Sequence, residues 1–241
     1  MPTDFKSFPD EISLDLIRTS RFDGICYQDV KRKGRGGTFH HSTSFFIARN
    51  FLLTSGHNVT KLYFGRNKPH KVYIHPSRIG DQFHGGSIEF NLDYNQNISL
   101  APQYKFTKKK TRIPHDMALI YIPDAIIDKN ESLSEISYLP FLEDLSSLEE
   151  GEPIYCVGYP ASEGYESAFK MTLDESQLGS KHTSSFTHDL DTKTGNSGSP
   201  IMVKRNNQYH VIGINSIKYN GTLINQEKKN WIEKSMRNMP N

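Results

Sequence analysis

One serine of this chain lies in a setting that suits a nucleophile. Ser197 stands within residues 192–200 (TKTGNSGSP), between Gly195 and Gly198. A nucleophilic hydroxyl must project from a tight turn, and backbone N–H groups beside it must be able to point at a developing oxyanion. Gly195 can adopt the backbone conformation that turns its N–H inward, and Gly198 would leave room for a substrate. Alone the pattern is weak, because glycine–serine turns are common.

Two other residues are of the types that such a serine needs as partners. His57 follows the apolar run 51–54 (FLLT), and Asp116 opens the apolar run 117–122 (MALIYI). The order His, Asp, Ser is one of the three chain orders in which a serine triad is found. Each residue alone could be structural, the histidine at a strand end and the aspartate at a strand start. All three together, in this order and context, predict acyl transfer by an activated serine.

These motifs resemble those of the chymotrypsin-fold (trypsin-like) serine proteases, and most of all the glutamyl endopeptidase and exfoliative toxin group. The resemblance extends from about residue 38 to residue 234. Asn196, before the serine, resembles this bacterial group, because digestive enzymes carry an aspartate there. The matching segments are LLTSGHNV, HDMALIYI, IYCVGYP, DLDTKTGNSGSP, YHVIGINS and NGTLINQEKKNWIEK.

The resemblance implies an all-β fold of two six-stranded antiparallel β-barrels with a C-terminal α-helix. It also implies a serine endopeptidase that cleaves protein or peptide substrates through an acyl-enzyme, without a cofactor. His57, Asp116 and Ser197 would form the catalytic triad, and the N–H groups of Gly195 and Ser197 would form the oxyanion hole. Because Asn196 is neutral, the oxyanion turn would form without the ion pair on which the digestive enzymes depend.

The pocket for the residue before the cleaved bond departs from the family pattern. Glutamyl endopeptidases bind the substrate carboxylate with a threonine five residues before the serine, which Thr192 matches, and with a histidine, which Asn215 replaces. Lys218 matches a lysine of the acidic-side-chain pocket in exfoliative toxins, and Ser216 is a further expected substrate-binding residue. We therefore expect a preference for Glu or Asp, carried by Thr192 and Lys218. In the alternative, Lys218 points to solvent and the pocket takes small or polar residues such as Gln.

Turn signals divide the chain into five segments. These are an N-terminal arm (1–20, with a short helix at 11–18), an N-terminal barrel (21–122), an inter-barrel linker (123–151), a C-terminal barrel (152–225) and a C-terminal segment (226–241). Many short strand-like runs between Gly and Pro turns are typical of barrels and sandwiches. We expect strands at 21–28, 38–47, 51–54, 72–75, 87–92, 103–107, 117–122, 153–159, 167–173, 184–188, 200–203 and 209–215, and a helix at 226–237.

Composition limits the classes of partner. The chain has 241 residues and a formal net charge of +2, and it has no run of about 18 apolar residues that could span a membrane. We expect no membrane or nucleic-acid partner, and a monomer. A metal site is also not expected, because no histidine pair has the spacing of helical zinc ligands and no cysteine adjoins a histidine. The histidines considered are His40, His41, His70, His75, His84 and His115.

Two other functional classes stay open. The chain could be a catalytically silent relative used as a binding module, although no triad residue is replaced. It could also be an adaptor that binds nucleic acid through its basic runs 31–35 and 108–110, which we otherwise interpret as solvated loops.

The cysteines and the N-terminus bear on the cellular compartment. Cys26 and Cys156 are the two cysteines, one in each half, and we interpret them as buried thiols, with a bridge as the alternative. The start of the chain lacks the apolar core of a signal peptide. We expect a bacterial protein that stays inside the cell or leaves by a leaderless route, unless the chain begins after processing.

Overall fold

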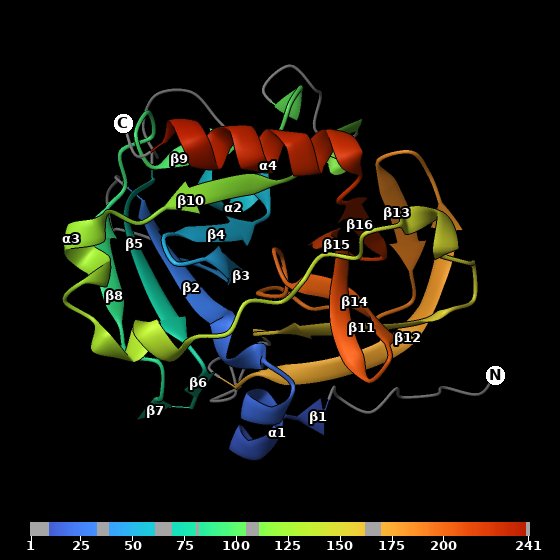
Figure 1. The fold of residues 1–241 in the computed structure, drawn as a ribbon, viewed down its shortest axis with the longest axis horizontal. Coiled ribbons are helices and arrows are strands. Elements are labelled where there is room, and N and C mark those ends of the chain that lie inside the picture. The colour runs from blue at the N-terminus through green and yellow to red at the C-terminus, as the bar shows by residue number, and fades with distance from the viewer. Residues whose placement is uncertain are drawn as a thin grey trace.

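Two antiparallel β-sheets lie side by side in this protein (Figure 1). The structure is a computed structural model that describes residues 10–32, 39–60, 69–80, 82–104, 111–161 and 170–239. The N-terminal sheet is drawn in blue to green, and the C-terminal sheet in yellow-orange to red except for its blue edge strand β1 (Asp10–Glu11). The expected all-β double-barrel fold with a C-terminal helix is thereby confirmed.

The N-terminal sheet is a curled sheet of seven strands in the order β8-β5-β2-β3-β4-β10-β9. Neighbouring strands alternate in direction, and β2 has the longest pairings, with β3 on one side and β5 on the other. The strands are β2 (Ile25–Arg32), β3 (Phe39–Ala48), β4 (Phe51–Thr54), β5 (Pro69–Pro76), β8 (Ile88–Asn91), β9 (Ile98–Leu100) and β10 (Ala118–Tyr121). A separate small hairpin joins β6 (Arg78–Ile79) to β7 (Gln82–Phe83).

The C-terminal sheet closes on itself. Its order is β1-β12-β11-β14-β15-β16-β13, and the additional pairing of β12 with β13 turns six of the seven strands into a barrel. Closure removes unpaired edges. The strands are β1 (Asp10–Glu11), β11 (Pro153–Gly158), β12 (Thr172–Lys181), β13 (Ser185–His188), β14 (Pro200–Arg205), β15 (Gln208–Ile217) and β16 (Asn220–Leu223).

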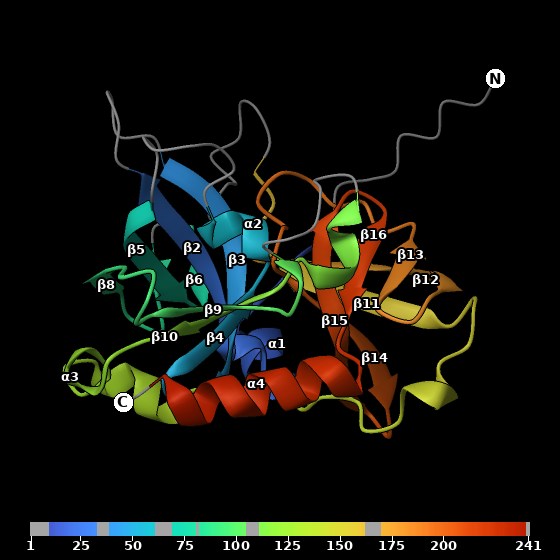
Figure 2. The same ribbon diagram turned by 90° about the horizontal axis from the view of Figure 1, so that it is seen from above.

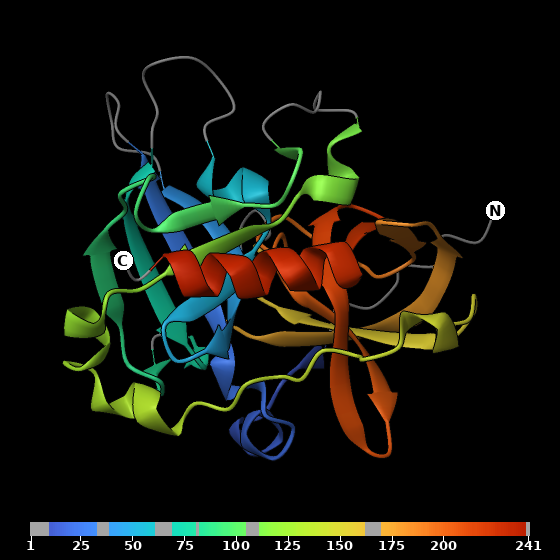
Figure 3. The same cartoon turned by 45° about the horizontal axis from the view of Figure 1, so that its top comes forward.

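Helices occupy the ends and connections of the two sheets. The longest, α4 (Gln226–Asn238), runs across both halves of the molecule (Figures 1 and 3). Figure 2 shows α2 (Gly56–Val59) on the side of the N-terminal half that faces the C-terminal half. The others are α1 (Leu14–Thr19), α3 (Asp124–Ile127), η1 (Phe22–Gly24), η4 (Ile113–His115), η5 (Glu131–Glu135) and η6 (Leu145–Ser147).

Apolar packing joins the halves into one body. One buried cluster fills the N-terminal sheet and another fills the C-terminal barrel. A third cluster draws residues from both halves, including Tyr27 on β2 and Tyr159 after β11, whose rings meet edge to face with centroids 5.6 Å apart. Ile232 of α4 belongs to this third cluster. The junction at which three expected site residues meet is therefore held by a continuous apolar core.

The described part of the N-terminal arm, residues 10–20, packs on the barrels, whereas we expected the arm to lie outside them. Ile12 and Ile17 are buried in the shared core, at 3% and 0% exposure, and β1 pairs with β12. The helix α1 begins at its N-cap Ser13, whose hydroxyl accepts a hydrogen bond from the Leu16 N–H (3.2 Å). Burial of these two side chains and the pairing of β1 with β12 therefore hold this segment against the barrels.

Several expected strands differ in position. The first begins at Ile25 and not at residue 21, because η1 intervenes. The strand expected at 103–107 is wrong where it can be compared, since Gln103 lies in a turn with a φ of 66°; residues 105–107 lie outside the described residues. The strand expected at 167–173 begins at Thr172 and continues to Lys181, and 167–169 are likewise not described. The strand β16 was missed, because its short glycine-containing sequence gives little apolar signal.

Both cysteines are free and buried, as predicted from their placement in different halves. Burial raises the pKa of the Cys156 thiol to about 12, and it also raises the pKa of Cys26. In the described part of the chain, no helix combines the length and the apolar character needed to cross a membrane.

Candidate active site

His57 lies where a buried strand of the N-terminal sheet turns into a helix. All four residues of β4 are buried, and the chain then enters α2 at Gly56. A side chain at Gly56 would meet the Tyr104 ring, since a Cβ there would lie 2.7 Å from it. The preceding Ser55 donates a hydrogen bond to the Asn215 carbonyl of the other half (2.8 Å). The segment that carries His57 is therefore fixed to both halves.

Asp116 is buried at the junction and contacts His57 twice. It follows η4 and precedes β10, and it is 4% exposed. Its Oδ1 accepts a hydrogen bond from the His57 N–H (2.9 Å), and its Oδ2 lies 2.7 Å from His57 Nδ1. The Ser216 hydroxyl donates to the same Oδ2. With its proton on Nδ1, the His57 ring keeps Nε2 available as an acceptor, which is the tautomer a general base needs.

The electrostatics of Asp116 agree with this geometry. Burial raises the pKa of the Asp116 carboxyl, but attraction to the His57 ring and the hydrogen bonds from His57 and Ser216 outweigh it. The net result is an Asp116 pKa below the ordinary value for aspartate. The carboxylate thus stays charged at neutral pH despite its burial.

The turn around Ser197 depends on two glycines in the left-handed region. Gly195 has a φ of 97° and Gly198 a φ of 91°, which favours glycine at both positions. A Cβ at Gly195 would lie 2.2 Å from the Tyr159 carbonyl oxygen, and one at Gly198 would lie 2.2 Å from the Thr43 carbonyl oxygen. The space beside Gly198 is therefore filled by the first barrel, and it is not room for a substrate as the sequence suggested.

Hydrogen bonds fix the turn while leaving two N–H groups available. The Asn196 N–H donates to Lys193 O (3.1 Å) and the Ser199 N–H donates to Asn196 O (3.0 Å). Among the described residues, no acceptor is recorded for the N–H of Gly195 or of Ser197. These are the two donors expected for an oxyanion hole.

The Ser197 hydroxyl points at a backbone carbonyl. It donates to Ser216 O (3.3 Å), and within the described part of the chain no hydrogen bond joins it to His57. Such contacts are often loose in a protein without substrate and tighten when substrate binds. A rotation of the Ser197 side chain would be needed to direct its proton to His57.

The expected substrate-binding residues separate into an interior and an exterior group. Thr192 and Asn215 are buried, at 5% and 2% exposure. The Thr192 hydroxyl has no hydrogen-bond partner among the described residues, while Asn215 donates to Asn196 O (3.0 Å). Ser216 is also buried, but its side chain binds Asp116. Lys218 is exposed, and its ammonium lies 4.7 Å from the centroid of the Tyr219 ring.

The sequence interpretation missed several residues around this site. Asn58 and His40 lie beside His57 and Ser197, and His188 lies against the Asn215 side chain. The Ser216 hydroxyl on Asp116 was also missed. The sequence held one signal for Asn58, which is its position directly after His57. A polar residue buried next to the candidate base requires hydrogen-bond partners.

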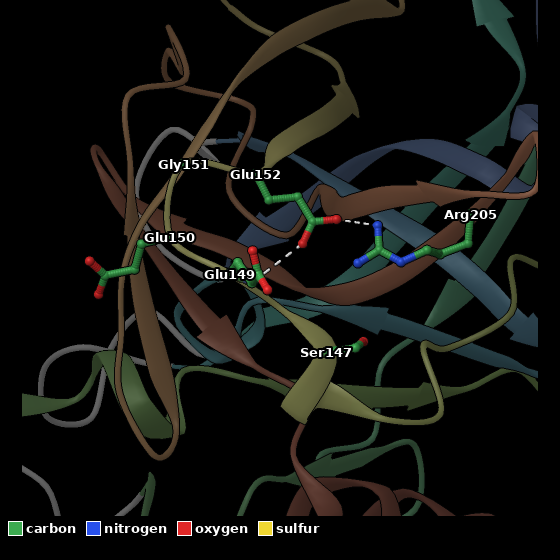
Figure 4. A pocket seen from close by; sticks show the side chains of 6 residues that line it. All are labelled: Ser147, Glu149, Glu150, Gly151, Glu152 and Arg205. Atoms are coloured by element: carbon green, nitrogen blue, oxygen red, sulfur yellow. Dashed lines mark hydrogen bonds and ion pairs between the residues drawn. The ribbon is translucent and has the colours of Figure 1, made fainter.

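A separate hollow of about 480 Å³ lies at the end of the C-terminal barrel (Figure 4). It is lined by residues 147 and 149–152 together with Arg205, whose guanidinium pairs with the Glu152 carboxylate. None of its lining residues belongs to the expected triad. Among the described residues, no group of three or more His, Cys, Asp or Glu side chains could hold a metal ion.

Three solved structures that are similar to this chain are proteases. A Glu endopeptidase solved in complex with MPD is 18% identical, with a TM-score of 0.72 and coverage of 95% of this chain and 96% of that one. The thermostable serine protease AL20 from an extremophilic microorganism is 14% identical (TM-score 0.66; 91% of this chain, 100% of that one). The protease Anisep from Arthrobacter nicotinovorans is 11% identical (TM-score 0.60; 85% and 90%).

Identities this low establish the shared fold alone. No curated protein sequence matches the chain. The family model of the trypsin-like peptidase domain matches residues 42–214, which is most of the chain and includes His57, Asp116 and Ser197. The chain therefore belongs to the trypsin-like peptidase domain family.

Proposed function

We propose that the protein is a serine endopeptidase whose triad is Ser197, His57 and Asp116. Ser197 Oγ forms a bond to the carbonyl carbon of a peptide while its proton passes to His57 Nε2. The carbonyl oxygen becomes an oxyanion that receives hydrogen bonds from the N–H groups of Gly195 and Ser197. The carbon–nitrogen bond then breaks, and the leaving amine takes the proton from His57. Water, deprotonated by the same histidine, hydrolyses the acyl-enzyme.

The observation that carries this proposal is the arrangement at Asp116. A buried carboxylate with a lowered pKa receives hydrogen bonds from the His57 backbone, the His57 ring and Ser216. If Asp116 were purely structural, it would need hydrogen-bond partners as well. It would not, however, require His57 to lie at the junction of the halves with its Nε2 available as a proton acceptor. The two N–H groups of the nucleophile turn that have no recorded acceptor agree with it. Removing one such donor costs about 3–4 kcal/mol of transition-state stabilisation.

For the residue before the cleaved bond, we propose a preference for Glu or Asp. The Thr192 hydroxyl lies five residues before Ser197, and it is buried without a hydrogen-bond partner among the described residues. Two lysines, Lys193 and Lys218, lie near this segment, although Lys193 pairs with Asp191 (2.6 Å) and Lys218 stacks on Tyr219. For Lys218 to reach a substrate carboxylate, its side chain must leave that ring. If it does not, the pocket of Thr192 and Asn215 takes small or polar residues such as Gln.

The experiment that tests the activity is labelling with a fluorophosphonate together with hydrolysis of a peptide library. The wild type should be labelled and should cleave peptides. Ser197→Ala should lose both and keep its thermal unfolding midpoint, with residual turnover of roughly 10³–10⁴ over water. Ser180→Ala, at an exposed serine of the same barrel, is the matched control. A Ser197→Ala protein that keeps a tenth of the wild-type rate would exclude Ser197 as nucleophile.

The alternative is a catalytically silent binding module. In that case the wild type would resist labelling while remaining folded, and its affinity for a peptide would not depend on the Ser197 hydroxyl. The described residues favour the active form, because each triad position carries its expected residue type.

A further inference from the structure

Asn58 is a fully buried amide directly after His57 in the chain. It lies in α2, and its backbone N–H donates to Ser55 O (3.1 Å). A buried amide offers two N–H donors and one carbonyl acceptor, and each of these groups destabilises the fold if it is left without a partner. The hydrogen-bond partners of the Asn58 side chain therefore identify the segments that it joins.

Both donors of the Asn58 amide are used, and they extend in different directions. Its Nδ2 donates to the Thr54 hydroxyl (2.9 Å) on its own sheet and to the carbonyl oxygen of Ser197 (2.9 Å) on the other half. The Thr54 hydroxyl donates onward to Thr43 O (2.7 Å), so it accepts from Asn58. The Ser197 carbonyl also receives the Thr43 N–H (3.0 Å). The peptide unit of the expected nucleophile is thus held by two donors, both from the N-terminal half.

The acceptor of the same amide binds a second histidine. Asn58 Oδ1 lies 3.2 Å from His40 Nε2, and the His40 ring stands edge-on to the His57 ring, with centroids 6.4 Å apart and an interplanar angle of 70°. A flipped amide would set Oδ1 against Ser197 O, which is also an acceptor, so the observed orientation is the one that satisfies all partners. His40 must then carry its proton on Nε2.

We propose that Asn58 is a positioning residue that sets the Ser197 backbone and the His57 ring relative to each other across the junction of the two halves. This inference rests on the proposed function. Asn58 acts through Ser197 and His40, and it touches neither the Oγ nor the imidazole that exchange the proton. His57 and Asn58 are consecutive in the chain. A shift of one half against the other therefore moves the His57 ring together with the Asn58 amide that holds the Ser197 carbonyl. Misplacement of reacting groups by about 1 Å can cost roughly 100-fold in rate.

The test compares Asn58→Asp and Asn58→Leu with the wild type. Aspartate keeps the shape but cannot donate to Ser197 O, and leucine removes all three contacts while filling a similar volume, so one variant serves if the other fails to fold. The matched control is Asn97→Asp, because Asn97 is a buried amide of the same half that donates to the Tyr121 carbonyl (3.0 Å) away from the site. Measurements are kcat and KM on one peptide, the rate of fluorophosphonate labelling, and the unfolding midpoint.

We expect kcat and the labelling rate of both Asn58 variants to fall roughly 10- to 100-fold with KM within about twofold of wild type. Asn97→Asp should keep both kinetic constants whatever its stability. A kcat within twofold of the Asn97→Asp value, or a change in KM alone, would overturn the positioning role while leaving the proposed function intact. A wild type that neither hydrolyses peptides nor reacts with the probe would overturn both.

Discussion

At the scale of single residues, the site is defined by hydrogen bonds that join distant parts of the chain. The Ser216 hydroxyl reaches Asp116 across 100 positions, and Asn58 reaches Ser197 across 139. The residues of the proposed triad stand out in local motifs, since a histidine after a buried strand and a serine between glycines are short-range patterns. The supporting contacts could not, because they depend on how two sheets dock.

Ser216→Ala should weaken catalysis without changing substrate choice. The hydroxyl lowers the pKa of the buried Asp116 carboxyl and satisfies one of its lone pairs. Losing a hydrogen bond to a charged group costs about 1.5 kcal/mol or more, so kcat/KM should fall roughly tenfold with the same ranking of peptides. The measurement is kcat/KM at neutral pH on the preferred peptide and on one poor peptide. An unchanged value would mean that His57 alone holds Asp116.

The proposed preference for Glu or Asp can be tested at Lys218. Peptides matched except for Glu, Gln, Leu or Lys before the bond should be cleaved by the wild type with the highest kcat/KM for Glu. An ammonium contact to a carboxylate is about twice as strong as a neutral hydrogen bond, so Lys218→Ala should lower the Glu-to-Gln ratio. If Gln equals Glu in the wild type, the exposed position of Lys218 over Tyr219 is also its working position. If Glu wins in both proteins, the carboxylate is bound by another group.

At the scale of elements, periodicity predicted α4 well and the irregular strands poorly. The helix expected at 226–237 is observed at 226–238, because a stripe of apolar side chains along a polar helix needs only local sequence. By contrast, β16 has four residues with a glycine, and β12 is largely polar along its ten residues. Those strands are specified by their pairing partners, which no window of sequence contains.

Two adjacent lysines of α4 should respond oppositely to the same substitution. Lys228 has no exposed surface, its Nζ has no hydrogen-bond partner among the described residues, and the nearest carboxylate, Glu227, is 3.9 Å away. Burial lowers its pKa. Lys228→Met should therefore stabilise the fold by roughly 1 kcal/mol or more at neutral pH. Lys229 donates to the carbonyls of Leu142 and Glu143, so Lys229→Met should destabilise it.

The pH dependence of the free energy of unfolding shows whether buried Lys228 destabilises the fold. Because the pKa of Lys228 is lowered in the folded state, the unfolded chain binds more protons at this group between the folded pKa and the ordinary pKa of about 10.4. Its unfavourable contribution is present at neutral pH and fades as pH rises through the folded pKa toward that value. Urea unfolding of the wild type should therefore show an alkaline gain that Lys228→Met lacks. Equal slopes in the two proteins would contradict a lowered pKa of Lys228 in the folded state.

The cap of α4 offers a second test at this scale. Asn225 accepts the Lys228 N–H at Oδ1 (3.1 Å) and donates to Thr183 O (2.9 Å), which ties the helix to the C-terminal barrel. Replacing an N-cap by alanine costs about 1 kcal/mol. Asn225→Ala should cost more than Ser13→Ala at the cap of α1, where the described contacts give the hydroxyl only the Leu16 N–H. The measurement is the denaturant midpoint of each variant, which should be lower for Asn225→Ala than for Ser13→Ala.

At the scale of the whole molecule, the two halves are joined by side chains that touch the nucleophile turn. The Thr43 hydroxyl of β3 donates to Gly195 O (2.9 Å) and accepts from the Tyr159 N–H (3.0 Å). Ser55 and Asn58 add further bonds across the same junction. The hydrogen bonds that hold the Ser197 turn therefore also hold the two halves against each other. The double barrel could be predicted from the motifs, but this coupling could not.

Each half also carries a buried histidine whose pKa is lowered to about 4, His75 in the N-terminal sheet and His188 in the C-terminal barrel. Burial is the main cause in both, and for His75 the positive charge of Arg78 adds to it. A histidine pKa lowered on folding means that the unfolded chain binds more protons between about 6.5 and about 4. Stability therefore falls as pH drops through this range and levels off below it.

His188 should account for a defined part of this acid loss. It is 2% exposed and lies against Phe186 and Asn215, with Asp189 nearby as the one opposing charge among its recorded contacts. The shift corresponds to about 3 kcal/mol at most. His188→Gln removes the titrating group, so its unfolding free energy should change less between pH 6.5 and pH 4 than that of the wild type. His41, whose pKa is raised chiefly by its hydrogen bond to Asp29, acts above this window and should leave the comparison unaffected. Identical acid slopes in His188→Gln and wild type, from urea titrations at each pH, would show that His188 is protonated in the folded protein.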